Sequence, residues 1–270
     1  MTEDSPQSQD THAFPPRIAR WRRGLRWFMA EFLVVVVGIL VAMALNSWYQ
    51  GRQDAQNERA YLQRLSRDLQ GTIDSLQEAR AFEQKQYDDG IFASRALAAS
   101  TRPADVEAVA TAMTHLGERR TLLLRNATYL DMLNTGNLRL IHDTKLRDRV
   151  TGFYQDTQFK FEIINKNNTA LVDETYRQRV IASGLVMPRI SSNLASNAMR
   201  NAEARRMLGD AIRSPADRLW ALPPDAPEWA IVRGNLLARV NVASTSSFLL
   251  VQCIEDALAL KAEVDAALAR

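Results

Sequence analysis

The longest predominantly apolar run of the chain covers residues 27–48, WFMAEFLVVVVGILVAMALNSW. These 22 residues contain one charged side chain, Glu31, near the start of the run. As an α-helix the run would extend about 33 Å, and the hydrocarbon core of a bilayer is about 30 Å thick. Trp27 and Trp48 stand at its two ends, where amphipathic rings favour the membrane interface. The pattern therefore predicts one transmembrane helix.

A cleavable signal peptide is the main alternative for this run. Ala42-Met43-Ala44 matches a small-x-small cleavage site, so removal of the segment after Ala44 stays open. A buried core helix is a second alternative, but Phe32–Leu45 carries no polar side chain on any face. The tryptophans on both sides and the long leader favour an uncleaved anchor.

Basic residues are concentrated just before the run, where five arginines lie within ten residues of it. The positive-inside rule places this end in the cytoplasm and residues 49–270 outside, which in a bacterium is the periplasm. Residues 1–26 then form a disordered cytoplasmic tail, whose arginines can contact anionic lipid of the bilayer. The residues expected to anchor and orient the helix are Arg22, Arg23, Arg26, Trp27, Glu31, Gly38, Ala42, Asn46 and Trp48.

Gly38 and Ala42 are four residues apart on one face of this helix. Small residues at that spacing permit the close approach of a second membrane helix. Homo-oligomerisation through the membrane helix is therefore one hypothesis, and association through the exported part is another.

Beyond the run, apolar positions recur at steps of three and four, which is the spacing of one helix face. Only Gly51 interrupts the helical pattern before Leu62, so the helix is expected to continue out of the membrane. Pro103 ends it, because the residue before a proline avoids the α conformation. The stripe over residues 50–100 consists of Leu62, Leu65, Leu69, Ile73, Leu76, Tyr87, Ile91 and Ala98.

Two charged residues, Arg80 and Glu83, interrupt this stripe at a spacing of three and could satisfy each other. One interpretation is a solvated stretch beyond the packed core. The other is a polar layer or ligand site among the helices. Thr157 and Asn168 occupy stripe positions of a later helix and complete the candidate polar layer.

Turn and cap residues divide the rest of the chain into further helices. Gly136 is expected in a left-handed C-terminal cap, and Asp143 is expected to cap the next helix. The loop with four prolines over 214–227 has two apolar anchors, Leu219 and Trp220. The expected helices cover residues 104–116, 119–134, 144–183, 193–213 and 228–270. The stripe of the third consists of Leu146, Val150, Phe153, Thr157, Phe161, Ile164, Asn168 and Leu171. That of the last consists of Leu236, Val240, Ala243, Ser247, Leu250, Ile254, Ala257, Lys261, Val264 and Leu268.

No stretch shows sustained period-two alternation rich in β-branched residues, so no sheet is expected. Long helices joined by short breaks favour an all-α fold. The expected architecture is a single N-terminal transmembrane helix followed, over residues 49–270, by an antiparallel bundle with long, partly coiled-coil-like helices.

The composition argues against several kinds of partner and site. The net charge is +3, but residues 32–270 hold 29 basic and 27 acidic side chains, and this near-neutrality argues against nucleic acid as a partner. The single cysteine, Cys253, cannot form an intramolecular disulfide and is expected to be a small buried hydrophobe, an intermolecular disulfide being the alternative. The histidines show no metal-ligand spacing, and none of the common phosphate-binding or catalytic motifs is present. We therefore expect no cofactor, no metal and no identifiable catalytic residue.

Two stretches of the sequence, AEFLVVVVGILVAMALNSWYQGR at residues 30–52 and YLDMLNTGNLRLIHDTKLRDRVTGFY at residues 129–154, share a pattern with known proteins. They resemble a bacterial membrane-protein family known as domain of unknown function 6090. Ala30 stands where that family usually has glycine, and Ser47 where a second asparagine is common. The resemblance implies a single-pass anchor with a helical exported domain, and it brings no known activity. In the first stretch the matching residues are Glu31, Val36, Val37, Gly38, Ile39, Asn46 and Trp48. In the second they are Leu133, Gly136, Leu138, Ile141, Leu146 and Tyr154.

The sequence thus predicts a bitopic inner-membrane protein whose periplasmic helical bundle acts as a protein-interaction, assembly or sensing module. The alternative is a cell-envelope enzyme, or a protein that binds a small molecule or lipid, with a polar site inside the bundle. Convergent polar residues in a concave pocket would favour that alternative.

Overall fold

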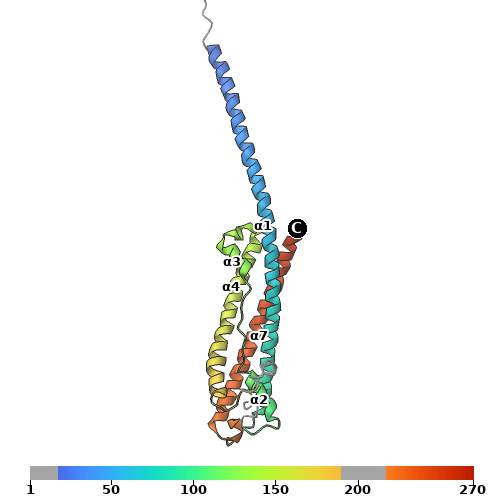
Figure 1. The fold of residues 1–270 in the computed structure, drawn as a ribbon, viewed down its shortest axis with the longest axis vertical. Coiled ribbons are helices and arrows are strands. Elements are labelled where there is room, and N and C mark those ends of the chain that lie inside the picture. The colour runs from blue at the N-terminus through green and yellow to red at the C-terminus, as the bar shows by residue number, and fades with distance from the viewer. Residues whose placement is uncertain (1–17, 190–216) are drawn as a thin grey trace, which may run out of the picture. The chain divides into compact units, whose positions relative to one another are not determined.

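The structure is a computed structural model, and it describes residues 18–189 and 217–270. Every regular element among them is helical, so the predicted all-α class is confirmed for the described residues (Figure 1). The chain separates into two compact units, Met1–Asn57 and Glu58–Arg270. The predicted helix over 193–213 lies outside the described residues, as do residues 1–17.

The first unit contains the start of helix α1 (Ile18–Ala96). The prediction of a disordered tail over residues 1–26 is wrong for residues 18–26, which are helical. The reason is local, because no proline follows Pro16 and the arginine- and leucine-containing stretch after it has good helix propensity. The helix passes Gly51 without a break, as the sequence predicted.

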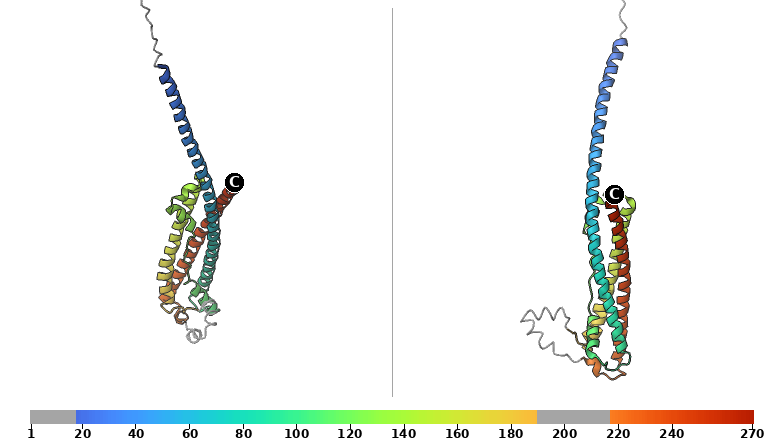
Figure 2. Two further views of the ribbon diagram at one scale, coloured as in Figure 1. Left: turned by 45° about the horizontal axis from the view of Figure 1, so that its top comes forward. Right: turned by 90° about the vertical axis from the view of Figure 1, so that its right-hand side faces the viewer.

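The second unit is built on three long helical segments that lie side by side (Figures 1 and 2). These are the part of α1 from Glu58 onward, α4 (Thr144–Asn167) with η2 (Asn168–Ile181), and α7 (Pro227–Leu268). The short elements are α2 (Val106–His115), α3 (Ala127–Asn134), η1 (Asn137–Leu140) and η3 (Arg218–Ala221).

Contacts between side chains set the direction of each long helix. Ser66 on α1 donates a hydrogen bond to Asp265, and Arg233 donates one to Ser100, so α1 and α7 run antiparallel. Helices α4 and α7 are also antiparallel. Arg149 pairs with Glu263, whereas Lys160, later in α4, pairs with Asp256, which is earlier in α7.

The predicted helix over 119–134 is correct only from Ala127 onward. Residues 119–126 have no regular secondary structure, and burial alternates along them: Leu122 and Leu124 are partly covered while Leu123 is exposed. Asn165 on α4 holds this segment, since its side chain accepts from the Leu122 N–H at 3.2 Å and donates to the Leu122 carbonyl at 3.4 Å. Tertiary hydrogen bonds therefore override the local helix preference.

The predicted stripe of α1 is correct as far as Leu76 and wrong beyond it. Tyr87 and Ala98 are exposed, and the buried face continues instead through Glu83, one of the two predicted interruptions, and through residues outside the predicted stripe. Along this buried face the steps of three and four residues continue without a break, because polar residues and a glycine occupy it for three turns. Its members after Leu76 are Ala79, Glu83, Gln86, Gly90, Ala93 and Leu97.

Helix η2 is a π-helix, and it changes which side chains face the core. Leu171, predicted as a stripe residue, is exposed, whereas Val172, Tyr176 and Val180 follow Asn168 at steps of four. A π-helix bonds each residue to the fifth one along, so a full turn takes more residues than in an α-helix. The stripe predicted from Leu146 to Asn168 is buried throughout.

Both predicted caps are confirmed. Gly136 has a φ of +71°, the left-handed conformation, and the Asp143 carboxylate accepts from the backbone N–H groups of Lys145 and Leu146. The loop anchors Leu219 and Trp220 lie in η3, where Leu219 is fully buried. The prediction that Cys253 is buried is also confirmed.

The core of the second unit consists of three apolar clusters in succession along the long helices. The first includes Leu65, Leu69, Tyr129, Phe153 and Leu260. The second includes Leu76, Phe161, Ile164, Leu250 and Cys253. The third includes Leu97, Met113, Tyr176, Trp229 and Leu236.

Candidate functional site: a buried polar layer

A layer of buried polar side chains separates the second and third apolar clusters. On each long helix the polar residues fall between the residues of those two clusters, so all three helices contribute to one level of the core. The members are Glu83 and Gln86 on α1, Asn168 on η2, and Arg239 and Ser246 on α7. Each is at most 3% exposed.

Arg239 is the centre of this layer. Its guanidinium contacts the Glu83 carboxylate at 3.4 Å, and it donates to the backbone carbonyls of Leu116 at 3.0 Å and Glu118 at 3.4 Å. Those carbonyls follow the end of α2, where the last carbonyl groups have no helical partner. Arg239, which lies on α7 and contacts Glu83 on α1, therefore fixes the end of α2 to these two long helices.

Burial controls the electrostatics of the pair. Transfer out of water disfavours a lone carboxylate, so burial raises the pKa of Glu83 more than the neighbouring Arg239 charge lowers it. Tyr176, fully buried nearby, donates to the Met113 carbonyl at 2.7 Å, and burial raises the pKa of its hydroxyl. Tyr176 thus acts as a neutral hydrogen-bond donor.

Several polar atoms of the layer have no hydrogen-bond partner among the described residues. They are Gln86 Oε1, Asn168 Oδ1 and Ser246 Oγ. Asn168 uses only its amide N–H, which donates to the Arg120 carbonyl at 3.4 Å. A buried polar atom without a partner costs on the order of 1–3 kcal/mol, so this level of the core is less stable than the apolar clusters beside it.

The structure brings together only part of the predicted polar layer. Glu83 and Asn168 lie in it. Arg80 is exposed, and the predicted Arg80–Glu83 pair is wrong, because Glu83 turns inward to Arg239 while Arg80 faces solvent one turn away. Thr157 is buried elsewhere, beside the thiol of Cys253 in the second apolar cluster.

Arg239, Gln86 and Ser246 were missed from the sequence. A signal for them existed, because Arg239 and Ser246 fall at heptad spacing with Leu236, Ala243 and Leu250 on α7. A strict heptad count would have placed both in the core. The stripe predicted for residues 228–270 contains Val240 and Ser247 at these places instead, and both are only half-buried.

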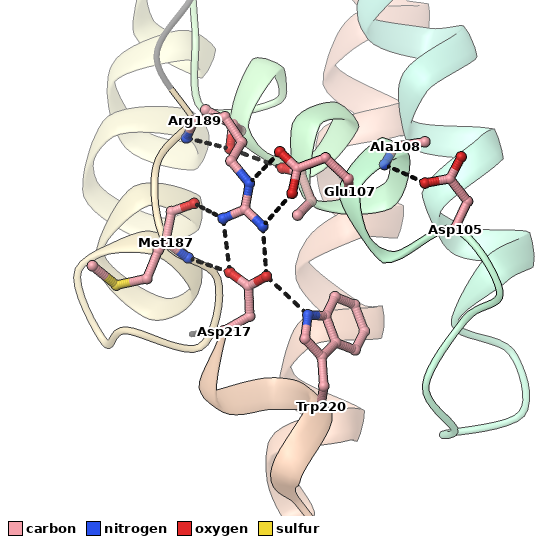
Figure 3. A network of polar contacts seen from close by, with 9 residues as sticks. Asp105, Glu107, Ala108, Met187, Arg189, Asp217 and Trp220 are labelled. Atoms are coloured by element: carbon pink, nitrogen blue, oxygen red, sulfur yellow. Dashed lines mark hydrogen bonds and ion pairs between the residues drawn. The ribbon is translucent and has the colours of Figure 1, made fainter. Parts of the chain in front are cut away.

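A second polar network ties two loop segments together (Figure 3). Arg189 forms a bidentate ion pair with Asp217, with hydrogen bonds of 2.7 and 3.0 Å, and a second bidentate pair with Glu107 on α2. Asp217 also accepts from the Met187 N–H and the Trp220 indole. Burial would raise the pKa of Asp217, but these hydrogen bonds together outweigh burial and lower it. The network is a structural clamp between α2 and η3.

Three hollows are described in the second unit. The largest, about 520 Å³, lies between α1 and α2 and is lined by charged and apolar side chains including Lys85, Asp89 and Phe92. None of the three described hollows includes Arg80, Glu83, Thr157 or Asn168. Among the described residues no group of three or more metal-ligating side chains comes together.

The predicted anchor residues lie on α1 in the first unit. Apart from the half-exposed Val36, the described apolar side chains over 27–49 are exposed, with Trp27 73% and Trp48 64% accessible. The Arg52 guanidinium lies 5.8 Å from the Trp48 ring. A Cβ added to Gly38 would meet no other atom, so that helix face is open. The backbone of Arg22, Arg23 and Arg26 is helical. Their side chains lie outside the described residues.

Two helices have the length and hydropathy of a membrane span. The apolar window within Trp27–Ala96 has a mean hydropathy of 2.7 and is 0% buried, whereas that of α7 has a mean hydropathy of 1.3 and is 39% buried. The second is explained by the core contacts of α7. The first has no such explanation.

Comparison of the chain with protein-family models, with curated proteins and with solved structures found no match. The resemblance to the family of unknown function therefore stays a prediction.

Proposed function

We propose that this chain is a single-pass inner-membrane protein whose N-terminus is cytoplasmic and whose residues 49–270 are periplasmic. In this proposal residues 27–48 are the membrane anchor, and the second unit is an antiparallel helical bundle. The bundle serves as a protein-interaction, assembly or sensing module.

The observation that carries the membrane assignment is that none of the residues in the apolar window is buried. Soluble proteins rarely expose contiguous apolar patches larger than a few hundred Å². Here exposed apolar side chains lie on all sides of the helix over residues 27–49, and the chain buries none of the residues in the apolar window. A bilayer is the solvent that suits such a surface, and Trp27 and Trp48 suit its two interfaces.

The orientation is supported by the arginine cluster before the anchor. Arginines at 17, 20, 22, 23 and 26 precede it, while after it Arg52 and Arg59 are accompanied by Asp54 and Glu58. Positive residues are retained on the cytoplasmic side during insertion.

A sensing or assembly role is supported by the polar layer and by what lies beside it. Glu83 and Arg239 bind each other, and Arg239 also binds a backbone carbonyl. The described part of the layer therefore has no charged group that is free to bind a substrate. Unbonded polar atoms and the change to a π-helix at Asn168 coincide at one level of the core. Regions of low local stability are those that rearrange when a partner binds.

A reporter that is active only in the periplasm, fused after Arg270, tests the topology. We expect activity from the intact chain and loss of activity when the five arginines are replaced by serine and an equal number is placed after Tyr49. An inactive reporter on the intact chain would overturn the orientation. The mass of the mature protein distinguishes an anchor from a signal peptide, because cleavage after Ala44 would remove 44 residues.

Photo-crosslinking in native membranes tests the interaction role. A crosslinking residue at Leu123, which is 80% exposed, should capture a specific protein. The matched control is a crosslinking residue at Leu133 in α3, 48% exposed, which should give a different pattern if capture is specific. Capture of no protein from positions all round the second unit, with a small molecule that co-purifies, would favour the envelope-enzyme alternative.

A further inference from the structure

Helix α7 carries two seams with heptad spacing, and only one of them faces the core. The inner seam is buried and includes Leu236, Arg239, Ala243, Ser246 and Leu250. The outer seam follows the same alternating steps of four and three on the other side of the helix. Its members are Gly234, Ala238, Asn241, Thr245, Phe248 and Gln252, all exposed or half-exposed.

The outer seam is free of charge over its whole length. Between Gly234 and Gln252 the one charged residue is Arg239, and it belongs to the inner seam. The stretch covers 19 residues, or about 27 Å of helix. By contrast, the exposed positions of α1 at the same level include Glu78, Arg80 and Lys85. Phe248, at 62% exposed, and the flanking Leu237, at 61%, add large apolar side chains to the outer seam.

We infer that this outer seam of α7 binds the outer seam of a second copy of the chain. The absence of charge favours a second copy over another partner. In a parallel two-fold pair each residue faces its own counterpart, so any charge on the seam would meet a like charge. A partner of different sequence imposes no such restriction and commonly contributes complementary charges.

The individual residues suit a parallel, in-register pair. Gly234 and Ala238 let two helices approach closely, and Phe248 can pack against its own counterpart. Asn241 is both a donor and an acceptor, so two copies can bond to each other at the centre of a seam and fix its register. The seam becomes acidic at Glu255, where like charges would face each other, so the pairing is expected to end at Gln252.

The inference rests on the proposed assembly role, because anchors inserted in one direction from one membrane favour parallel copies. It does not require the anchor itself to associate. The Gly38–Ala42 face of the anchor is a separate site, and a dimer held only there would leave the α7 seam uncovered.

Cysteine substitution on the full chain in native membranes tests the contact. The native Cys253 is buried, so the unsubstituted chain should form no disulfide. Thr245→Cys should give a disulfide-linked dimer on mild oxidation, because identical seam positions meet. Gln155→Cys, on the exposed face of α4, is the control and should remain monomeric. A monomeric Thr245→Cys chain, or equal crosslinking of both variants, would overturn the inference.

A pair of phenylalanine variants tests whether the seam supplies binding energy. Phe248→Lys places a lysine against its own counterpart and should weaken dimerisation of the detergent-solubilised chain about tenfold or more. Phe159→Lys on α4 is matched to it, since Phe159 is 64% exposed, and should leave the dimer unchanged. Light scattering over a range of concentrations measures both.

The outcomes also separate this inference from the membrane proposal. If Gly38→Leu abolishes the dimer and Phe248→Lys does not, association lies in the anchor and the seam proposal is wrong. If the chain is found in the soluble fraction but Thr245→Cys still forms its disulfide, the seam proposal stands and the anchor proposal fails.

Discussion

Arg239 and Glu83 form an ion pair that is closed to solvent, with side chains 0% and 3% exposed on α7 and α1. Neither helix could bury its charged residue alone, because an unpaired charge in a core costs several kcal/mol. The pair therefore fixes the register of two helices whose contacts are separated by more than 150 residues of chain. It also explains why the buried seam of α1 can contain a glutamate.

Loss of one partner of this pair should be more damaging than loss of both. Arg239→Met leaves Glu83 buried without its partner, and the full chain in detergent should lose about 3–5 kcal/mol of unfolding free energy. Adding Glu83→Met should recover part of that loss. Urea unfolding followed by circular dichroism measures both variants. Arg80→Met is the control, since this exposed residue should change stability by less than about 0.5 kcal/mol. Strictly additive losses in the double variant would show that the two residues are not coupled.

The long helices, both caps and the buried cysteine were predictable because they depend on local chemistry. The apolar spacing defined α4 and α7, and Asp143 and Gly136 mark ends at which backbone groups lack helical partners. The polar layer was only half predictable. Glu83 and Asn168 stood out on apolar stripes, but the partner of Glu83 lies on a helix far along the chain, and Arg80 was the nearer candidate.

The non-helical segment over 119–126 and the π-helix were not predictable from local preference. Leucine and arginine favour a helix, and nothing near Leu122 in the sequence shows that Asn165 will bind its backbone. Likewise the wider turn of η2 changes the buried face from Leu171 to Val172, a one-residue shift that an α-helical count cannot show. Both features are decided by contacts between distant parts of the chain.

The clamp around Asp217 should make stability depend on acid pH. Hydrogen bonds hold the folded-state pKa of Asp217 below its ordinary value, so the carboxylate contributes stability above the unfolded-state pKa. That contribution should be lost as the pH falls through the lowered folded-state value. Thermal unfolding measured over a pH series should therefore decline less steeply in Asp217→Asn than in the unsubstituted chain. The exposed Asp225→Asn should behave like the unsubstituted chain, and an unchanged slope in Asp217→Asn would contradict the clamp.

The thiol of Cys253 should be unreactive in the folded chain. Burial raises its pKa to about 11, a shift that the nearby Lys160 only partly opposes, so very little thiolate exists at neutral pH. A thiol reagent at pH 7.5 should modify Cys253 slowly in detergent and rapidly in urea. Rapid modification under native conditions would show that the second apolar cluster opens. Such rapid modification would also favour the alternative in which Cys253 forms an intermolecular disulfide.

Asn165 should stabilise the second unit through the backbone of Leu122 alone. Asn165→Ala removes an acceptor for the Leu122 N–H and a donor for its carbonyl, and we expect a loss of about 1–3 kcal/mol of unfolding free energy. Asn167→Ala is the matched control, because Asn167 lies two residues away on α4. Alanine is also the better helix former, so this variant should be neutral or slightly more stable. Hydrogen exchange gives the sharper measurement, since the Leu122 amide should lose protection in Asn165→Ala and keep it in Asn167→Ala. Equal protection in the two variants would mean that apolar contacts of Leu122 and Leu124, rather than the asparagine, hold the segment in place.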